Sequence, residues 1–245
     1  MLRLSLSLLA LSALVACGGD VEPATGGGPE GDTDTDTDTD TDTDTDSDAD
    51  TDTIYDVQSG AVAEGTVVTG QGIVASDEDG SGFFLQSVDG TGEYSGIWVY
   101  ADSDETIGVS RRDLISFTAT YEEYVTGKSG GSLSELVITG PGDVTVESST
   151  ALHPAVELTV QQASNDNTAE PYEGVLVIVK NVTVTNPDLD YGEWELDGKL
   201  AVDDALYAYE GELSNGKTFT SITGFLHWSY DAWKLEPRDA NDFVE

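Results

Sequence analysis

The residues best suited to recognition chemistry are aromatic. The densest group lies at residues 227–233 (His-Trp-Ser-Tyr-Asp-Ala-Trp), and a second group contains Trp98, Tyr100, Tyr121 and Tyr124. Such rings stack on bases or sugars, and the polar tips of tyrosine and tryptophan hydrogen-bond to a ligand. The alternative is that the rings pack the core and rim of a small β-barrel. We predict a ligand-binding surface made by Trp98, Tyr100, Tyr121, His227, Trp228, Tyr230 and Trp233.

Acidic residues suggest a second kind of chemistry, the binding of Ca²⁺. Asp77 and Asp79 alternate in the segment 77–82 (Asp-Glu-Asp-Gly-Ser-Gly), and Asp102 and Asp104 follow the next pair of apolar runs. An ordered Ca²⁺ loop needs about six to eight oxygen ligands in a fixed turn, and the bidentate glutamate of an EF-hand is missing. Gly/Asp clusters are also ordinary turn residues. A weak Ca²⁺ site at Asp77, Asp79, Asp102 and Asp104 is therefore the alternative to an acidic turn.

No pattern in the sequence indicates catalysis. His153 and His227 are the only histidines and Cys17 is the only cysteine, so a zinc site would need carboxylates for most of its ligands. The chain contains no G-x-S-x-G, H-E-x-x-H or P-loop pattern. Acidic residues are frequent everywhere, and nothing singles out one carboxylate pair. We therefore expect a protein that is not an enzyme and holds no cofactor.

The charge of the chain argues against one broad class of partners. The sequence has 48 acidic and 9 basic residues, a net charge of −39. Of these, 14 acidic residues and 1 basic residue precede Ile54, which leaves 34 against 8, a net charge of −26, in the rest. Nucleic acid is bound by neutralising its phosphates with Lys and Arg, and Arg111-Arg112 is the only paired basic site. Nucleic acid is therefore not expected as a partner, and the acidity favours solubility.

The N-terminus has the features of a secretory signal. Residues 1–16 combine Arg3 with an apolar run that is too short to span a bilayer as a mature helix. The run ends in Leu-Val-Ala-Cys at residues 14–17, which resembles the lipobox of bacterial lipoproteins. The resemblance implies cleavage before Cys17 and acylation of its thiol, an anchor worth about 0.8 kcal/mol per buried CH₂. The residue after the cysteine is Gly18 and not Asp, which resembles bacterial lipoproteins that are sorted to the outer membrane. We therefore expect a lipid-anchored envelope protein at the outer membrane or cell surface.

Residues 17–53 form the predicted tether. After Gly26, Thr and Asp alternate from Asp32 to Asp46 and similar residues continue to Thr53. Period-two alternation normally indicates a strand, but here both partners are polar and every second residue is charged, so nothing can be buried. We predict a disordered, self-repelling acidic linker.

The remaining chain predicts two β-rich units in tandem, residues 54–142 and 172–245, joined by a connector at 143–171. Apolar runs of strand length separated by Gly, Asn and Asp are typical of small β-barrels. Within the connector, Thr159 is a candidate cap for a short helix. In the first unit the expected strands lie at 64–75, 82–86, 96–100, 113–121 and 133–138. In the second they lie at 172–179, 181–185, 192–196, 200–202, 217–228 and 233–235.

The segment 113–121 has the clearest alternation. Ile115, Phe117, Ala119 and Tyr121 share one face, and Leu114 begins a more polar face. Because successive strand residues point to opposite sides, the first set is predicted to face the core.

Both units contain a similar hairpin, which carries a family resemblance. Residues 82–86 (Gly-Phe-Phe-Leu-Gln) with 96–100 (Gly-Ile-Trp-Val-Tyr) are echoed by 192–202, and 172–177 and 235–238 add to the pattern. The chain resembles the OB-fold modules that precede the catalytic domain of secreted bacterial nucleases of the endonuclease/exonuclease/phosphatase type. The resemblance implies an all-β protein of two tandem five-stranded OB-like barrels. It also implies nucleic-acid binding, which the missing basic surface does not favour.

The sequence thus predicts a lipid-anchored envelope protein that presents non-catalytic binding or adhesion modules. The expected ligand is a neutral glycan, a peptide or a partner protein, because aromatic side chains without basic neighbours suit such ligands. The alternatives are a nucleic-acid-binding accessory lipoprotein and a purely structural surface spacer.

Overall fold

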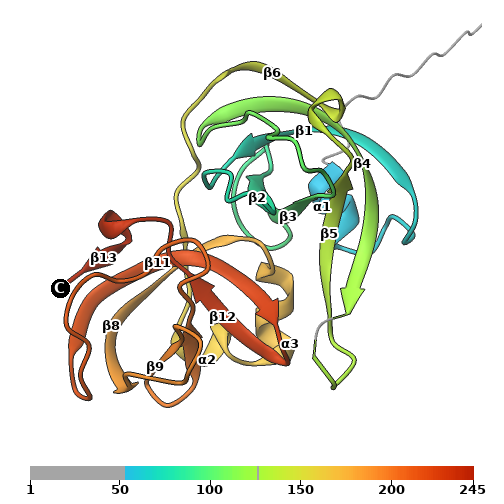
Figure 1. Ribbon diagram of the computed structural model, residues 1–245. Coiled ribbons are helices and arrows are strands. Elements are labelled where there is room, and N and C mark those ends of the chain that lie inside the picture. The colour runs from blue at the N-terminus through green and yellow to red at the C-terminus, as the bar shows by residue number, and fades with distance from the viewer. Residues whose placement is uncertain (1–52, 126) are drawn as a thin grey trace, which may run out of the picture. The chain divides into compact units, whose positions relative to one another are not determined.

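The computed structural model describes residues 53–125 and 127–245, which belong to one compact unit, Ser47–Glu245 (Figure 1). The fold is mostly β, with 43% of the described residues in strands and 12% in helices. The predicted signal peptide, Cys17 and nearly all of the tether lie outside the described residues. The prediction of an all-β fold is confirmed, and we call its two parts barrel A and barrel B after the sheets that form them.

Barrel A is built from a sheet that closes on itself. Its strand order is β1-β2-β3-β5-β4-β6, and β1 also pairs with β4, which completes the ring (Figure 1). β3 and β5 run parallel. A short helix, α1 (Thr53–Gln58), packs Ile54 and Val57 into the same core. The strands are β1 (Val67–Val74), β2 (Gly82–Gln86), β3 (Gly96–Ala101), β4 (Asp113–Val125), β5 (Ser132–Ile138) and β6 (Val144–Ser149).

The predicted alternation of β4 is confirmed. Ile115, Phe117, Ala119 and Tyr121 are all buried in the core of barrel A, whereas Thr118 on the opposite face is exposed. The hydrophobic effect therefore sets the register of this strand, because a slip by one residue would expose the whole apolar set.

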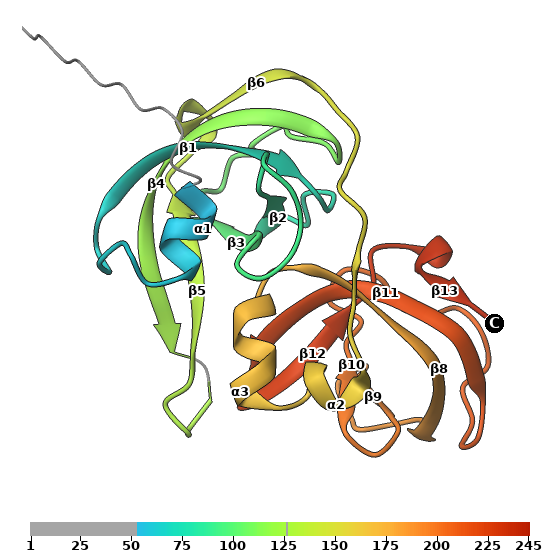
Figure 2. The same cartoon turned by 180° about the vertical axis from the view of Figure 1, so that it is seen from behind.

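Barrel B closes because strand β11 pairs with strand β8. The strand order of its sheet is β13-β11-β12-β10-β9-β8-β7, and the additional pairing of β11 with β8 completes the ring. Figure 2 shows α2 (Val160–Ala163) and α3 (Asp166–Ala169) beside this barrel. The strands are β7 (Val156–Glu157), β8 (Leu176–Asn186), β9 (Trp194–Leu196), β10 (Leu200–Val202), β11 (Thr218–Ser229), β12 (Ala232–Glu236) and β13 (Phe243–Val244); three 3₁₀ turns, η1 (Pro141–Asp143), η2 (Glu170–Tyr172) and η3 (Ala240–Asp242), complete the fold.

The predicted connector contributes more structure than its composition indicates. β6 pairs with β4 and so extends sheet A, and β7 pairs with β8 in sheet B. The predicted helix cap is confirmed, because Thr159 caps α2 in a reciprocal capping box with Gln162. Only a short stretch between Ser149 and Val156 therefore passes between the sheets without belonging to either.

An apolar seam joins the outer faces of the two sheets. Strand alternation directs Phe84 away from the core of barrel A and Phe225 away from that of barrel B. Their rings stack 4.1 Å apart at an interplanar angle of 9°. Ala75, Trp98, Leu133 and Leu176 complete a buried cluster around this pair. Since an aromatic pair adds about 0.5–1.5 kcal/mol to the burial of its area, the stack anchors one barrel against the other.

Polar contacts fix the same seam. Arg111 donates to Asp239 of barrel B at 2.5 Å and to Asp77 of barrel A at 2.9 Å. Gln58 donates to the backbone oxygens of Gly96 at 2.6 Å and Glu173 at 2.9 Å. The sequence predicts Arg111 as an ordinary solvated side chain with local acid partners, but one of its partners lies 128 residues away in the other barrel.

Two glycines let the backbones of the barrels meet. A Cβ on Gly174 would lie 2.7 Å from the Cα of Ile97, and a Cβ on Gly96 would lie 2.2 Å from the carbonyl oxygen of Gly174. Gly174 also has a φ of +69°, in the left-handed region. Both the space and the backbone conformation therefore require glycine at position 174.

Replacing Gly174 by alanine should weaken the seam, and Gly198 offers a matched control. Gly198 has the same φ of +69°, but a Cβ added there would have no neighbour within 4 Å. Both substitutions cost about 1 kcal/mol for the left-handed backbone. Gly174→Ala should cost a further 1–3 kcal/mol, roughly, from the backbone clash. Urea unfolding of both variants tests this, and equal losses would contradict the close approach.

Candidate ligand-binding cleft

The outer face of barrel A carries a row of cross-strand neighbours. Phe84 on β2 pairs with Trp98 on β3, Trp98 pairs with Glu135 on β5, and Glu135 pairs with Glu122 on β4. The neighbouring row contains Tyr100. Because these side chains point away from the barrel core, their burial depends on what barrel B places over them.

The outer face of barrel B supplies the opposite wall. His227 on β11 pairs with Lys234 on β12. The imidazole lies edge-on to Phe84, with ring centroids 5.7 Å apart, and roughly parallel to Trp98 at 6.2 Å. Its Nδ1 contacts Glu236, and its Nε2 is buried without a hydrogen-bond partner among the described residues.

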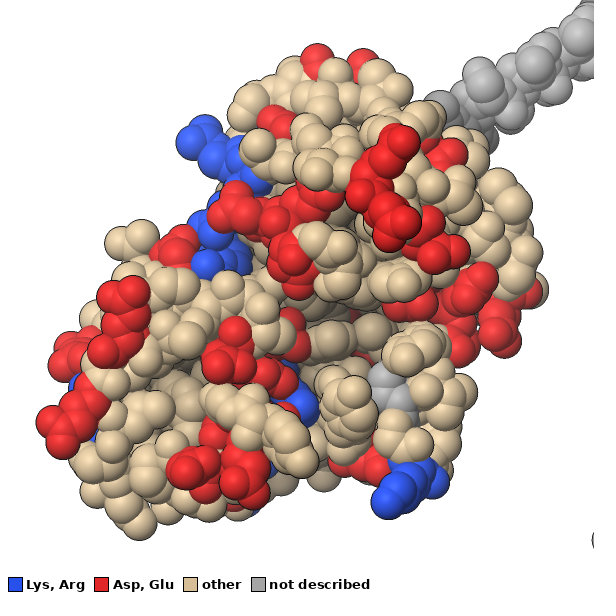
Figure 3. All heavy atoms as spheres, in the orientation of Figure 1, with Lys and Arg blue, Asp and Glu red and all other residues tan. Residues whose placement is uncertain are grey.

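Between these faces lies a cleft of about 570 Å³, which we call the seam cleft. Its volume suits a small ligand or one side chain. Aromatic rings, aliphatic side chains and three carboxylates line it, and none of the described residues in its lining is Lys or Arg. The lining residues are Ser81, Trp98, Tyr100, Asp102, Glu122, Tyr124, Val125, Gly127, Leu133, Glu135, Val137, His227, Ser229 and Tyr230. Figure 3 shows how far acidic side chains outnumber basic ones on one face of the molecule.

Burial sets the ionisation of the carboxylates and imidazole here. Burial raises the pKa of Glu135 to about 7, the charge of Glu122 adds to the rise, and His227 opposes it. For His227, burial lowers the pKa, but the charge and hydrogen bond of Glu236 outweigh burial and leave the pKa raised. Glu135 therefore changes charge close to neutral pH, where an ordinary carboxylate would not.

One edge of the cleft is held by a hydrogen-bonded turn. Asp231, at the tip of the β11–β12 hairpin, accepts hydrogen bonds from the backbone nitrogens of Lys128 at 2.8 Å and Ser129 at 2.9 Å. The hydroxyl of Ser129 and these amides lower the pKa of Asp231. The contact ties the β4–β5 loop to barrel B and so fixes the position of Tyr230, the neighbour of Asp231.

The structure brings together four of the seven aromatic residues predicted to bind a ligand. Trp98, Tyr100, His227 and Tyr230 all line the seam cleft. Tyr121 does not, because its side chain points into the core of barrel A. Trp228 and Trp233 do not, because they face the core of barrel B. Strand alternation separates Trp228 from His227, its neighbour in sequence.

The two remaining tryptophans line a separate hollow of about 430 Å³ with residues 129–132, Asp166 and Glu170. Their rings meet edge-on at 5.2 Å. The indole nitrogen of Trp233 donates to Asp166 at 3.1 Å, whereas that of Trp228 is buried without a described partner. Both indoles pack with the core of barrel B and line this hollow, so they do not share the seam cleft with Trp98.

The four aspartates of the weak Ca²⁺ prediction do not gather around one point. Asp77 is paired with Arg111. Asp79 accepts hydrogen bonds from the backbone nitrogens of Ser81 at 2.8 Å and Gly82 at 3.0 Å, as a turn residue does. Asp102 and Asp104 line a shallow hollow of about 300 Å³. In residues 53–125 and 127–245, no three acidic, histidine or cysteine side chains are arranged to hold a metal ion.

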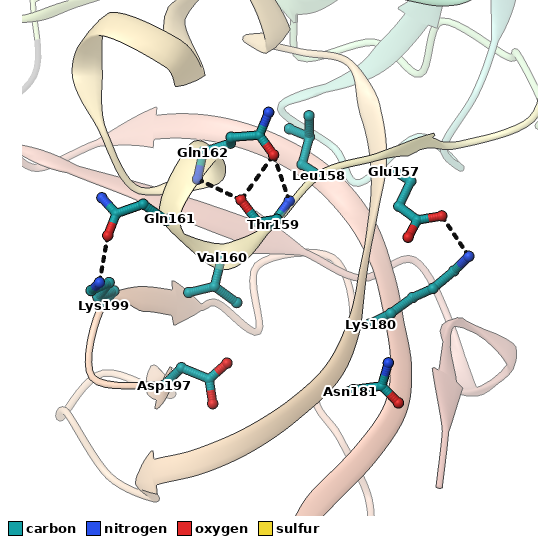
Figure 4. Close-up of a pocket in the computed structure, with 10 residues that line it drawn as sticks. All are labelled: Glu157, Leu158, Thr159, Val160, Gln161, Gln162, Lys180, Asn181, Asp197 and Lys199. Atoms are coloured by element: carbon teal, nitrogen blue, oxygen red, sulfur yellow. Dashed lines mark hydrogen bonds and ion pairs between the residues drawn. The ribbon is translucent and has the colours of Figure 1, made fainter.

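A further hollow of about 660 Å³ lies on barrel B beside α2 (Figure 4). Its polar side chains mostly bind one another. Lys180 pairs with Glu157 at 2.6 Å, Lys199 with Gln161, and Thr159 with Gln162. Although this hollow is larger than the seam cleft, most of its polar side chains already have a partner, so fewer groups are free to bind a ligand.

Glu122 and Glu135 line the seam cleft but are absent from the aromatic set predicted to bind. Glu135 is 6% exposed, in a strand where Leu133 and Leu136 are also buried. A lone carboxylate in the apolar run 133–138 is a signal that sequence reasoning can use, since buried carboxylates are rare. Its pairing with Trp98, by contrast, depends on the parallel register of β3 and β5, which no local pattern reveals.

Comparison with models of known protein families finds no match for this chain, and the curated proteins contain no match either. In the part of the chain that the structure describes, no helix is both long and apolar enough to cross a membrane.

Glu173 makes the seam sensitive to pH. Its side chain is 2% exposed, and one oxygen accepts from the backbone nitrogen of Ser134 at 2.9 Å while the other has no described partner. Burial raises its pKa well above the usual range, against the lowering effect of the Ser134 amide. The folded state therefore holds this proton more tightly than the unfolded state, and the stability it contributes at low pH is lost as pH rises through the folded pKa.

Replacing Glu173 by glutamine should reduce the loss of unfolding free energy between pH 5 and pH 8. The expected reduction is at least on the order of 1 kcal/mol, because the variant has no carboxyl to ionise in the seam. Urea unfolding at both pH values measures it. Glu212→Gln, at an exposed position, is the control. A pH dependence in Glu173→Gln identical to that of the wild type would contradict this account.

Proposed function

We propose that this protein is a lipid-anchored envelope protein whose two barrels form a non-catalytic binding module, with the ligand in the seam cleft. The observation that carries the proposal is that Trp98, Tyr100, His227 and Tyr230 line one cleft built by both barrels. Aromatic walls with a few convergent polar groups are the usual make-up of a ligand site.

Exposure of the aromatic rings favours binding over a purely structural spacer. Tyr230 is 77% exposed, Tyr124 58% and Tyr100 37%. Large rings at the mouth of a cleft lose little conformational entropy on binding and offer wide contact area. A spacer needs no such rings at the mouth of a cleft between its two parts.

We further propose that each barrel is an OB-like module, as the resemblance to the modules of secreted nucleases implies. The five-stranded closure of each sheet and the hairpin shared by the two halves support this assignment. Nucleic-acid binding remains the second candidate function. It is disfavoured because the described lining of the seam cleft has three carboxylates and no Lys or Arg, whereas phosphate binding needs cationic side chains.

Removing the exposed rings should weaken ligand binding. A ligand is first found by applying the purified full-length protein to arrays of neutral glycans and peptides. Tyr100→Ala and Tyr230→Ala should then each lower affinity about tenfold, because a stacking ring contributes on the order of 1–3 kcal/mol. Calorimetry measures the affinity.

Tyr191→Ala is the matched control for Tyr230→Ala. Tyr191 is 95% exposed with a φ of 57°, close to the 50° of Tyr230, but it does not line the cleft. The binding proposal fails if all three variants bind as the wild type does. Tight binding of single-stranded DNA that weakens with added salt would favour the nucleic-acid alternative.

The lipid anchor has a separate test. Cys17→Ala removes the thiol that acylation requires, so the protein should move from the membrane fraction to the soluble fraction of its cells. Labelling with a fatty-acid analogue should mark the wild type and leave the variant unmarked. A wild-type protein that carries no label would remove the anchor from the proposal.

A further inference from the structure

Glu135 places a carboxylate in the wall of the seam cleft. The residue is only 6% exposed, and its carboxylate oxygens, which are not among the fully enclosed polar atoms without a partner, have no hydrogen bond among the described residues. Its nearest cross-strand neighbours are Trp98, an apolar ring, and Glu122, which carries the same charge. Burying a carboxyl group in this way costs free energy, and an apolar residue would fill the position at no such cost. The cost is offset if the carboxylate meets a ligand.

Lys234 and His227, which lie beside the cleft, are already engaged elsewhere. The ammonium of Lys234 lies 2.5 Å from Glu193 and 3.0 Å from Asp203. His227 is held by Glu236. Asp102 and Glu122 add further negative charge to the lining. The cleft therefore presents unneutralised carboxylates, which are complementary to a cationic ligand.

The aromatic walls suit the same kind of ligand. A cation within about 6 Å of an aromatic ring centroid is attracted by the ring's quadrupole. The Tyr230 ring already takes part in such a contact, because the Lys234 ammonium lies 5.5 Å from its centroid. Trp98, Tyr100 and Tyr124 offer three more rings in the same lining.

The rest of the lining distinguishes between kinds of cation. Val125, Leu133 and Val137 are aliphatic, and among the described lining residues only Ser81 and Ser229 add hydroxyl groups to those of the tyrosines. A sugar ring needs a hydrogen-bond partner for most of its hydroxyls when it is desolvated, whereas a hydrocarbon stem needs none. The walls thus match an aliphatic stem that ends in a charge.

We infer that the seam cleft binds a lysine side chain of a peptide ligand, with the aromatic rings around its stem and the Glu135 carboxylate at its ammonium group. This inference rests on the binding function proposed above and names the chemistry of its ligand. Glu135 acts as a specificity residue, because its carboxylate attracts the ammonium group of lysine more strongly than the aromatic rings alone would.

Lysine binding should depend on pH in a defined direction. With a pKa of about 7, Glu135 gains a proton as pH falls from 8 to 6, while a lysine ammonium stays charged throughout. Affinity for lysine should therefore fall on acidification, by up to about tenfold. The other groups that face Glu135 are Glu122 on β4, His227 on β11 and Asp102 after β3.

His227, whose pKa Glu236 raises, gains positive charge on acidification and acts in the same direction; its ring contacts Glu236, and its strand partner on β12 is Lys234. The pH dependence that remains in Glu135→Gln measures this histidine contribution. The difference between wild type and Glu135→Gln isolates the carboxylate of Glu135.

The test uses the full-length protein and Nα-acetyl-lysine N-methylamide as the probe, measured by calorimetry at pH 8 and pH 6. Binding at pH 8 should weaken at least about tenfold when the probe's Nε is acetylated, and by a similar factor in Glu135→Gln. Glu212→Gln removes one exposed acidic charge outside the cleft and should bind as the wild type does. Thermal unfolding confirms that each variant is folded.

Three results would overturn the inference. One is equal binding of the acetylated and free probes, and another is unchanged binding in Glu135→Gln. The third is that glucosamine binds as tightly as the lysine probe, which would mean that the cationic ligand of the cleft is an amino sugar and not a lysine side chain. A further outcome separates this inference from the proposed binding function. If no amine binds, but a ligand from the arrays binds the wild type and loses affinity for Tyr230→Ala, the lysine inference fails and the proposed binding function stands.

Discussion

The stacked rings of Phe84 and Phe225 are the contact on which the rest of the structure depends. Each ring lies on the outer face of its sheet, where a solitary barrel would expose it to water. Burying both rings fixes one barrel against the other, and the seam cleft exists only because that relation is fixed. Gly96 and Gly174 permit the approach, and Arg111 spans it.

The shortage of basic residues shapes the electrostatics of this seam. From Ile54 onward only 8 basic residues face 34 acidic ones, and the structure pairs two of them with carboxylates that are partly or fully buried. Lys234 lies between Glu193 and Asp203, and Arg238 pairs with Asp242. No described Lys or Arg lines the seam cleft. Burial and the charge of Glu122 therefore raise the pKa of Glu135 to about 7, without a Lys or Arg side chain in the described lining to oppose them.

Local patterns predicted the strands well where one face is apolar and the other polar. The alternation of β4 and the cap at Thr159 both follow from interactions within a few residues. β6 and β7 were harder to foresee, because their pairing partners lie on other strands and their own burial is slight. The short helix α1 also forms in a segment whose composition predicts β-structure, and its residues Ile54 and Val57 pack into the core of barrel A.

By itself, the sequence determined the all-β class, the acidic character and the aromatic residues from which a site could be built, because these follow from composition and short-range periodicity. Only the tertiary structure decided which aromatic side chains meet. Strand alternation placed His227 in the cleft and Trp228 against the core of barrel B. The pairing of β3 with β5 then set Glu135 beside Trp98. Such a neighbourhood joins strands distant in sequence, and their register depends on long-range closure of the sheet.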